Sequence, residues 1–528
     1  MRVAPPLVLC LSLLACQKAP APAGEPKGPP PPDDVIAVAS VRSLDEAAAR
    51  YQQFLEAVQP GAGAALTAKA AAAGLAGAVG ASSIDGIALD KPMHVIVLDP
   101  KKHPRPVLLL GHGNAAAMKA GGAVAVEGKD GAALVGEKAG VELCAAWALG
   151  SLFREEVPAS PTVRASLRKL AALYQPEIEQ VKQSMGQVMT GGGSAGMAKV
   201  LQLEIDLLLR LAAQTEEMRL VVDASATEAS LELRFTPAPG SAFEAFDKAQ
   251  RPATEALFTH LTRLPSTPGS TMLFIGDYEL GPLRGVVFDL IGGAVASWAG
   301  TTPDAAFRRR WDDLLGHFKG PIAMASSQSA GPGTSMQQVM EVDDAPKTVA
   351  AIKALLPWNR PYTVDVFGMM KMQVTPQEAV ATHDGVAIDA LTIAFDMAGA
   401  DPMTQQILRR QWGDGMQLVM AGFDGRLAMV MGKDALADMK ATIDIARRRA
   451  PAVDLPGGAK LALGPATQRK ASYIFFMNMA ASMAAMTGRP TTADSGVTME
   501  LGFAGGNASV RFGVPAAHIR ELKGAMPF

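Results

Sequence analysis

Cysteine and aromatic residues are scarce in this chain of 528 residues. The three cysteines are Cys10, Cys16 and Cys144, and aromatic side chains make up 5% of the sequence. So few cysteines exclude a disulfide framework, and so few aromatics argue against a platform that stacks nucleic acid bases. The charge is also balanced, with a formal net charge of −2 and no long basic run. We therefore expect no nucleic acid partner.

Sequence motifs for metal or phosphate chemistry are missing as well. The chain holds no H-E-x-x-H, no C-x-x-C and no G-x-x-x-x-G-K-[ST] pattern. A G-x-S-x-G match surrounds Ser194, but this segment is expected to join two helices. A nucleophile elbow needs a strand-to-helix turn, and without one His112 has no catalytic partner. We predict no catalytic residue, no metal and no cofactor.

Two other groups of side chains could bind a metal. His94 and His112 would face each other if the intervening hairpin turned at His103, with Cβ atoms about 5 Å apart. No third ligand is evident, so half-buried or surface histidines are the favoured interpretation. Methionines that alternate along two expected strands could hold Cu(I), although gap-filling in the core is favoured because those faces should be buried. These methionines are Met370, Met372, Met429 and Met431.

Two further features have simple structural interpretations. Cys144 lies in the apolar run Leu143–Trp147, which predicts a buried helix and an unreactive thiol. The segment Lys101–Arg105 is basic and could touch anionic lipid headgroups, but a solvated hairpin end is favoured.

The N-terminus carries the most specific signal in the sequence. Arg2 precedes the short apolar stretch Leu7–Ala15, which is too short to span a bilayer and fits a secretory signal. The stretch ends in Leu13-Leu14-Ala15-Cys16, which resembles the lipobox of bacterial lipoproteins. That resemblance implies a signal peptide over residues 1–15, cleavage before Cys16 and lipidation of the Cys16 thiol.

The segment after Cys16 fits a tether. Residues 19–34 are rich in proline and are expected to be extended, which would hold the body about 50 Å from the lipid at about 3 Å per residue. Gln17 rather than aspartate follows the cysteine, and by analogy this points to the outer membrane. We expect a lipid-anchored protein of the cell envelope, on either the periplasmic or the surface face. No later segment is long and apolar enough to span a membrane.

The body is too long for one hydrophobic core, because single cores stop growing near about 250–300 residues. Similar strand, hairpin and helix patterns recur in the same order on both sides of the segment Leu264–Gly269. In the second half we expect a helix after the N-cap Asp344, a tight turn at Asp424-Gly425 and one long helix over residues 471–486. Each half should end with a short helix, after Pro239 in the first and after Pro515 in the second. We therefore expect an α+β fold with two related tandem halves, each a mainly antiparallel sheet covered by helices on one face. The boundaries are residues 16–34 for the lipidated cysteine and tether, 35–265 for the first half and 266–528 for the second. The first half should contain an extra helical hairpin over residues 160–189.

The order of these elements after a lipobox resembles, in pattern rather than in motif, uncharacterised exported bacterial proteins. The resemblance brings no catalytic residues with it. We expect a membrane-anchored envelope lipoprotein that is not an enzyme and that binds a protein partner or an apolar ligand. A ligand carrier would need an apolar cavity of several hundred Å³. The alternative is an envelope hydrolase with an unrecognised active site.

The lipobox gives a direct prediction. Cys16→Ser should abolish acylation, because serine lacks the thiol that forms the thioether. Cells expressing the parent or the variant can be labelled with a clickable palmitate analogue and compared by gel fluorescence. Cys144→Ser is the matched control and should label like the parent. Equal labelling of Cys16→Ser and the parent would exclude the anchor.

Overall fold

A computed structural model gives the arrangement of the body. It describes residues 28–525 except 82, 112–113, 115–116, 118–122, 190–204, 207–208, 278, 280–283, 293–294, 297–300, 329–333, 367–369, 397–404, 407–408, 410–412, 414, 488–491 and 505.

The described residues contain nineteen strands in one sheet. They are β1 Val35–Val41, β2 Met93–Leu98, β3 Val107–Leu110, β4 Val124–Glu127, β5 Ala133–Gly136, β6 Thr162–Ala165, β7 Thr215–Ala224, β8 Glu228–Pro237, β9 Met272–Gly276, β10 Phe318–Gln328, β11 Thr334–Val342, β12 Tyr362–Val366, β13 Met370–His383, β14 Val386–Asp396, β15 Gly415–Phe423, β16 Arg426–Gly432, β17 Ala471–Met477, β18 Val497–Ala504 and β19 Asn507–Pro515.

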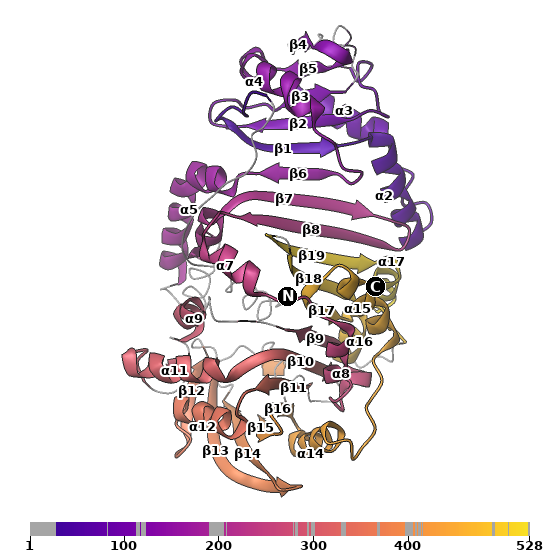
Figure 1. Cartoon of the computed structure of the whole chain (residues 1–528). Coiled ribbons are helices and arrows are strands. Elements are labelled where there is room, and N and C mark those ends of the chain that lie inside the picture. The colour runs from indigo at the N-terminus through magenta and orange to yellow at the C-terminus, as the bar shows by residue number, and fades with distance from the viewer. Residues whose placement is uncertain are drawn as a thin grey trace.

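The expectation of two separate sheets is wrong. Every pairing between neighbouring strands is antiparallel, and the spatial order is 4-5-3-2-1-6-7-8-19-18-17-9-10-11-16-15-14-13-12. Figure 1 shows this single twisted ladder, which runs from β4 and β5 at one end to β12–β16 at the other. Among the described strands, β4 and β12 each pair with one other strand, so the sheet stays open. The pairing of β8 with β19 joins what would otherwise be two open edges. The sequence pattern predicts individual strands, but it does not show which edge strands will pair.

The strands on the two sides of the β8–β19 pair follow corresponding orders. The first strand series, β1–β8, pairs as 4-5-3-2-1-6-7-8. The second strand series, β9–β19, pairs as 15-16-11-10-9-17-18-19, with β12–β14 added beyond β15. The order of pairing is therefore the same in both series, and the duplication of the sequence itself stays a prediction.

Helices lie against both faces of the sheet, and not against one face as expected. The α-helices of the described residues are α2 Leu44–Val58, α3 Ala68–Val79, α4 Lys138–Gly150, α5 Leu167–Met189, α7 Ala242–Ala249, α8 Phe258–Leu261, α9 Arg284–Val287, α11 Ala305–His317, α12 Ala345–Leu355, α14 Ala435–Ala446, α15 Gly457–Gln468, α16 Met479–Thr487 and α17 Ala516–Ala525.

The first strand series shows this most clearly. Met93, Leu108 and Leu110 pack with α3, whereas Leu98 and Leu109, which point to the other face, pack with α4. All four residues of β3 are buried for this reason. A strand that is covered on both faces becomes a continuous apolar run, as the sequence Val-Leu-Leu-Leu shows.

Several local signals in the sequence are confirmed. Asp344 caps α12, with its side chain accepting a hydrogen bond from the backbone N–H of Lys347. Asp424 and Gly425 have φ of 48° and 70° and form the tight turn between β15 and β16. Helices also begin where they were expected after Pro239 and Pro515, as α7 and α17.

Two helix predictions are wrong. Residues 471–486 were expected to form one long helix, but 471–477 form β17, which is buried on both faces, and α16 follows. A short apolar run does not reveal its own period, so helix and buried strand look alike in sequence. The expected helical hairpin over residues 160–189 is instead β6 followed by the single helix α5.

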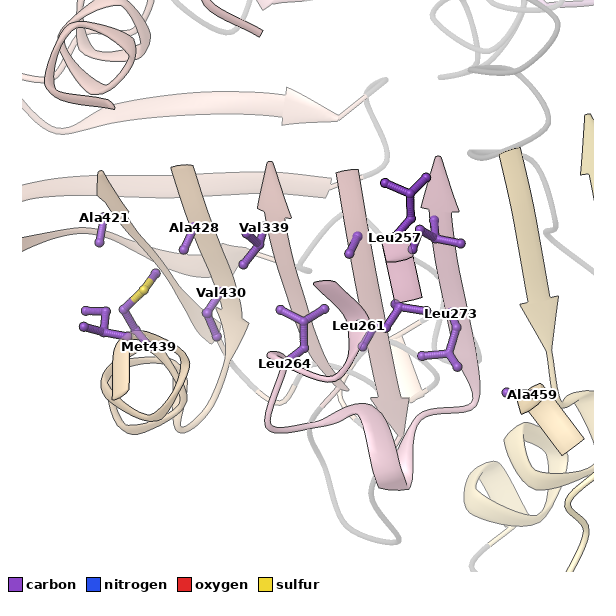
Figure 2. Close-up of a cluster of buried hydrophobic side chains, with 14 of the residues drawn as sticks. Leu257, Leu261, Leu264, Leu273, Val339, Ala421, Ala428, Val430, Met439 and Ala459 are labelled. Carbon is purple, nitrogen blue, oxygen red and sulfur yellow. The ribbon is translucent and has the colours of Figure 1, made fainter. Parts of the chain in front are cut away.

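The segment expected to link two halves is packed into a core. Leu264 opens this segment, and with the preceding Leu257 and Leu261 it lies in the same cluster as Leu273 and Val339 of the second strand series (Figure 2). Within the segment, the hydroxyl of the fully buried Thr267 donates to the carbonyl of Leu261 at 2.7 Å. Residues 253–264 therefore contribute to the core of the second strand series.

This packing predicts a large loss of stability on truncating Leu261. Leu261→Ala should lower the free energy of unfolding of the full chain by about 2–5 kcal/mol, because the side chain is fully buried and a cavity would remain. The matched control is Leu461→Ala at a position that is 80% exposed, where a change below about 0.5 kcal/mol is expected. Urea unfolding followed by circular dichroism measures both. Equal effects of the two substitutions would mean that Leu261 is not part of this core.

Candidate ligand-binding groove

Three of the candidate site residues named from the sequence lie outside the described part of the chain. Cys16, Ser194 and His112 all fall there. The end of the expected tether is described and lies against the body. The carbonyl of Pro29 accepts a hydrogen bond from Ser151 at 2.9 Å, and Asp34 forms an ion pair with Lys102 at 2.6 Å.

His94 is buried and does not have the expected register. It lies opposite Leu109 in the hairpin of β2 and β3, so the hypothesis that it opposes His112 is wrong. Its Nδ1 atom lies 2.8 Å from the hydroxyl of Ser40 on β1. Burial, and then the positive charge of Arg164, lower the pKa of His94 to about 4. His94 is therefore a neutral core histidine near pH 7.

The basic hairpin end at residues 101–105 is neutralised by neighbouring carboxylates. Lys101 pairs with Glu177 at 2.9 Å, and Arg105 lies 3.7 Å from Glu137. Lys102 and His103 share Asp34, and the hydrogen bond from Lys102 is the main reason that the pKa of Asp34 is lowered. These contacts favour a structural role over a headgroup contact.

Met372, Met429 and Cys144 pack in apolar surroundings, and the side chain of Met370 lies outside the described part of the chain. Met372 and Met429 lie against the cluster around Trp358 and Met420. Cys144 is fully buried in α4 as predicted, and burial raises the pKa of its thiol to about 11. In the described ranges, no three His, Cys, Asp or Glu side chains are grouped so that they could hold a metal ion. Within the same ranges, no helix is long and apolar enough to cross a membrane.

A groove of about 370 Å³ lies between α2, α3 and one face of the first strand series. Its lining is almost entirely apolar. The floor is formed by β1, β2, β6 and β7, and the walls by the two helices and the loop before α3. The lining residues are Ala39, Ser40, Val41, Leu44, Ala47, Ala48, Tyr51, Leu66, Thr67, Ala71, Leu75, Met93, Val95, Pro161, Thr162, Val163 and Val222.

The helix ends and small side chains explain why this space stays open. Ser43 caps α2 and accepts a hydrogen bond from Glu46 N–H, while Thr67 caps α3 and accepts from Ala70 N–H. These caps fix where both helices begin relative to the sheet. The sides of the helices that face the groove carry alanines, such as Ala47, Ala48 and Ala71, whose methyl groups do not reach far enough to fill the space.

The apolar floor continues beyond the groove across the middle of the sheet. Directly opposed residues share a face, and one such row runs through seven strands as Val95, Ala39, Val163, Leu220, Leu233, Val510 and Leu501. In the adjacent row Val222 lies opposite Leu231, which is 37% exposed. The groove is therefore one end of a longer apolar strip.

Sequence reasoning missed the groove because its parts are far apart in the chain. The signal was present in β7 and β8, where apolar and charged residues alternate as in Leu231-Glu232-Leu233-Arg234. That alternation predicts a strand with one apolar face. It does not say which helix covers that face, or that the covering helix presents alanines.

The chain was compared with family models, with curated proteins and with solved structures, and none of the three comparisons finds a match.

The buried His94 predicts a dependence of stability on pH. Its folded pKa of about 4 lies below the ordinary value of 6.5, so protonation favours the unfolded chain. Stability should fall as the pH drops from 6.5 towards 4, and His94 should account for about 2 kcal/mol of the loss between pH 7 and pH 4.5. His94→Gln should remove that part of the loss, measured as the difference in urea unfolding free energy between the two pH values. The same pH dependence in the variant and the parent would mean that His94 does not titrate in this way.

Proposed function

We propose that this protein is a lipid-anchored lipoprotein of the bacterial cell envelope that binds an apolar ligand in the groove under α2 and α3. The lipobox at Leu13–Cys16 supports the anchor. The main support for an apolar ligand is the groove itself, which has a volume of about 370 Å³ and an apolar lining. Small-molecule sites in proteins have volumes of about 300–1,000 Å³ and are mostly apolar.

The chemistry of the lining favours a hydrocarbon chain over a polar molecule. The valines at 95, 163 and 222 are only half-buried, so an apolar ligand would remove their side chains from water. Burial of each CH₂ group is worth about 0.8 kcal/mol, which makes a chain of several carbons a sufficient ligand. Thr67 and Tyr51 are polar groups in the lining that could contact a headgroup. A fatty acid or a lipid acyl chain fits this description.

The apolar strip supports the same ligand. It extends the floor of the groove to Leu220 on β7 and to the exposed Leu231 on β8, so a chain longer than the groove would continue on an apolar surface. Further along, Leu233 and Val510 pack against a buried cluster that includes Leu501. Leu220 and Leu233 on this strip are half-buried, in contrast to the fully buried Leu108 and Leu110 under α3.

Filling the groove tests the proposal. Protein from residue 17 onward should bind cis-parinaric acid, a fluorescent fatty acid whose emission rises in an apolar site. Ala48→Phe should weaken this binding by at least about tenfold, because the larger side chain occupies space that the ligand needs. The matched control is Ala49→Phe, one residue further along α2 on its exposed side, which should bind like the parent.

Thermal melts of both variants establish that they fold. Failure of the parent to bind the probe, or equal binding by parent, Ala48→Phe and Ala49→Phe, would refute a ligand site in this groove. If the parent protein binds no probe but captures a protein partner on the apolar strip, the strip is a protein docking surface instead.

A further inference from the structure

Three arginines lie directly opposite one another on the face of the sheet that is turned away from the groove. Arg164 on β6 is in register with Arg219 on β7, and Arg219 is in register with Arg234 on β8. Opposed residues have Cβ atoms about 4.5–5.5 Å apart, and like charges in such positions destabilise a sheet. Packing alone does not account for this arginine row.

Arg164 pairs with Glu155 at 2.5 Å, whereas neighbouring carboxylates satisfy Arg219 and Arg234 only in part. Arg219 bonds to Glu217 at 3.0 Å, and Arg234 uses two of its N–H groups on Glu232, at 2.8 and 2.9 Å. A guanidinium has five N–H donors, so both arginines keep donors for another group. Their side chains are 41% and 49% exposed, which leaves these donors accessible.

A hollow lies beside the arginine row because the row continues into small residues. Beyond Arg234 the residues in register are Ser509 on β19 and Gly502 on β18. Neither fills its place in the row, and a cavity of about 330 Å³ results. We call this cavity the arginine hollow.

The arginine hollow is lined by polar and mostly basic side chains. Arg469 and Lys470 line it together with Arg219 and Arg234, against the two carboxylates of Glu217 and Glu232. Arg469 also donates two N–H groups to the buried carboxylate of Glu500 behind the lining. The lining and Glu500 together therefore carry four positive and three negative charges. Thr236, Asn507 and Ser509 add hydroxyl and amide groups, and the hydroxyl of Thr236 donates to Asn507 Oδ1 at 2.9 Å.

We propose that the arginine hollow binds a phosphate group carried on a small hydroxyl-rich molecule, such as a sugar phosphate. Two arginines in register present planar donor pairs, which match phosphate oxygens in bidentate geometry. The excess positive charge of the lining favours an anion, and a bound anion would offset the repulsion along the arginine row. The hydroxyl and amide groups would take the sugar hydroxyls. The hollow and the apolar groove lie on opposite faces of the sheet, so this site does not depend on the proposed function.

The test is calorimetric titration of protein from residue 17 onward with glucose 6-phosphate, inorganic phosphate and glucose. Glucose 6-phosphate should bind most tightly, phosphate more weakly, and glucose without measurable heat. Binding should weaken as the salt concentration rises. Arg234→Gln should weaken the binding of glucose 6-phosphate by at least about tenfold, because it removes charged donors. Arg42→Gln is the matched control, since Arg42 forms an exposed pair with Glu46 on α2, and it should bind like the parent.

A second measurement separates a ligand site from a purely structural array. Arg219→Gln removes the central charge of the arginine row. The only described ion pair that it removes is the exposed one with Glu217, and exposed ion pairs contribute little to stability. Without ligand, this variant should melt at the same temperature as the parent or at a higher one, while losing the binding. A lower melting temperature together with no binding by the parent would overturn the proposal. Binding of the parent only to anionic phospholipid vesicles, and to none of the soluble phosphates, would overturn it in favour of a membrane contact.

Discussion

The pairing of β8 with β19 is the interaction on which the rest of the structure depends. Residues 228–235 are hydrogen-bonded in register with residues 508–515, so a strand from the middle of the chain lies beside the last strand. Without this pairing each strand series would end in a long open edge, and unpaired edges are prone to aggregation. With it, the remaining edges are the short strands β4 and β12, and both faces of the sheet run without interruption from one series to the other.

Alternation along these central strands then creates two surfaces of opposite chemistry. In β7 and β8 the even-numbered and odd-numbered positions point to opposite faces, so Leu220 and Leu233 share one face and Arg219 and Arg234 share the other. The apolar strip crosses the junction through Val510, and the arginine row meets Ser509 on the neighbouring position of the same strand. In both places a concavity forms where small residues lie. Alanines of α2 and α3 leave the groove open, and Ser509 with Gly502 leaves the arginine hollow open.

The local features of this fold could be predicted from the sequence, whereas the surfaces could not. The cap at Asp344, the turn at Asp424-Gly425 and the buried thiol of Cys144 each depend on a few neighbouring residues, and each is confirmed. The register of His94 was wrong because its partner is Leu109, three residues before His112, and such a shift changes every pair along both strands. The single sheet, the groove and the arginine hollow all depend on which distant strands become neighbours. Arg219 and Arg234 were visible as residues, but only the register of β7 with β8 makes them opposed charges.

The contacts of residues 29–34 connect the proposed anchor with the proposed site. Pro29 is bonded to Ser151, Asp34 to Lys102, and the carbonyl of Asp33 accepts from Lys169 at 2.8 Å, so this part of the proline-rich segment belongs to the body. The chain between Cys16 and Gly28 can reach at most about 40 Å when fully extended. That distance is shorter than the reach expected for a free tether over all of residues 19–34. A lipid on Cys16 would therefore keep the body within about one domain diameter of the membrane, where an apolar ligand could pass between bilayer and groove without a long path through water.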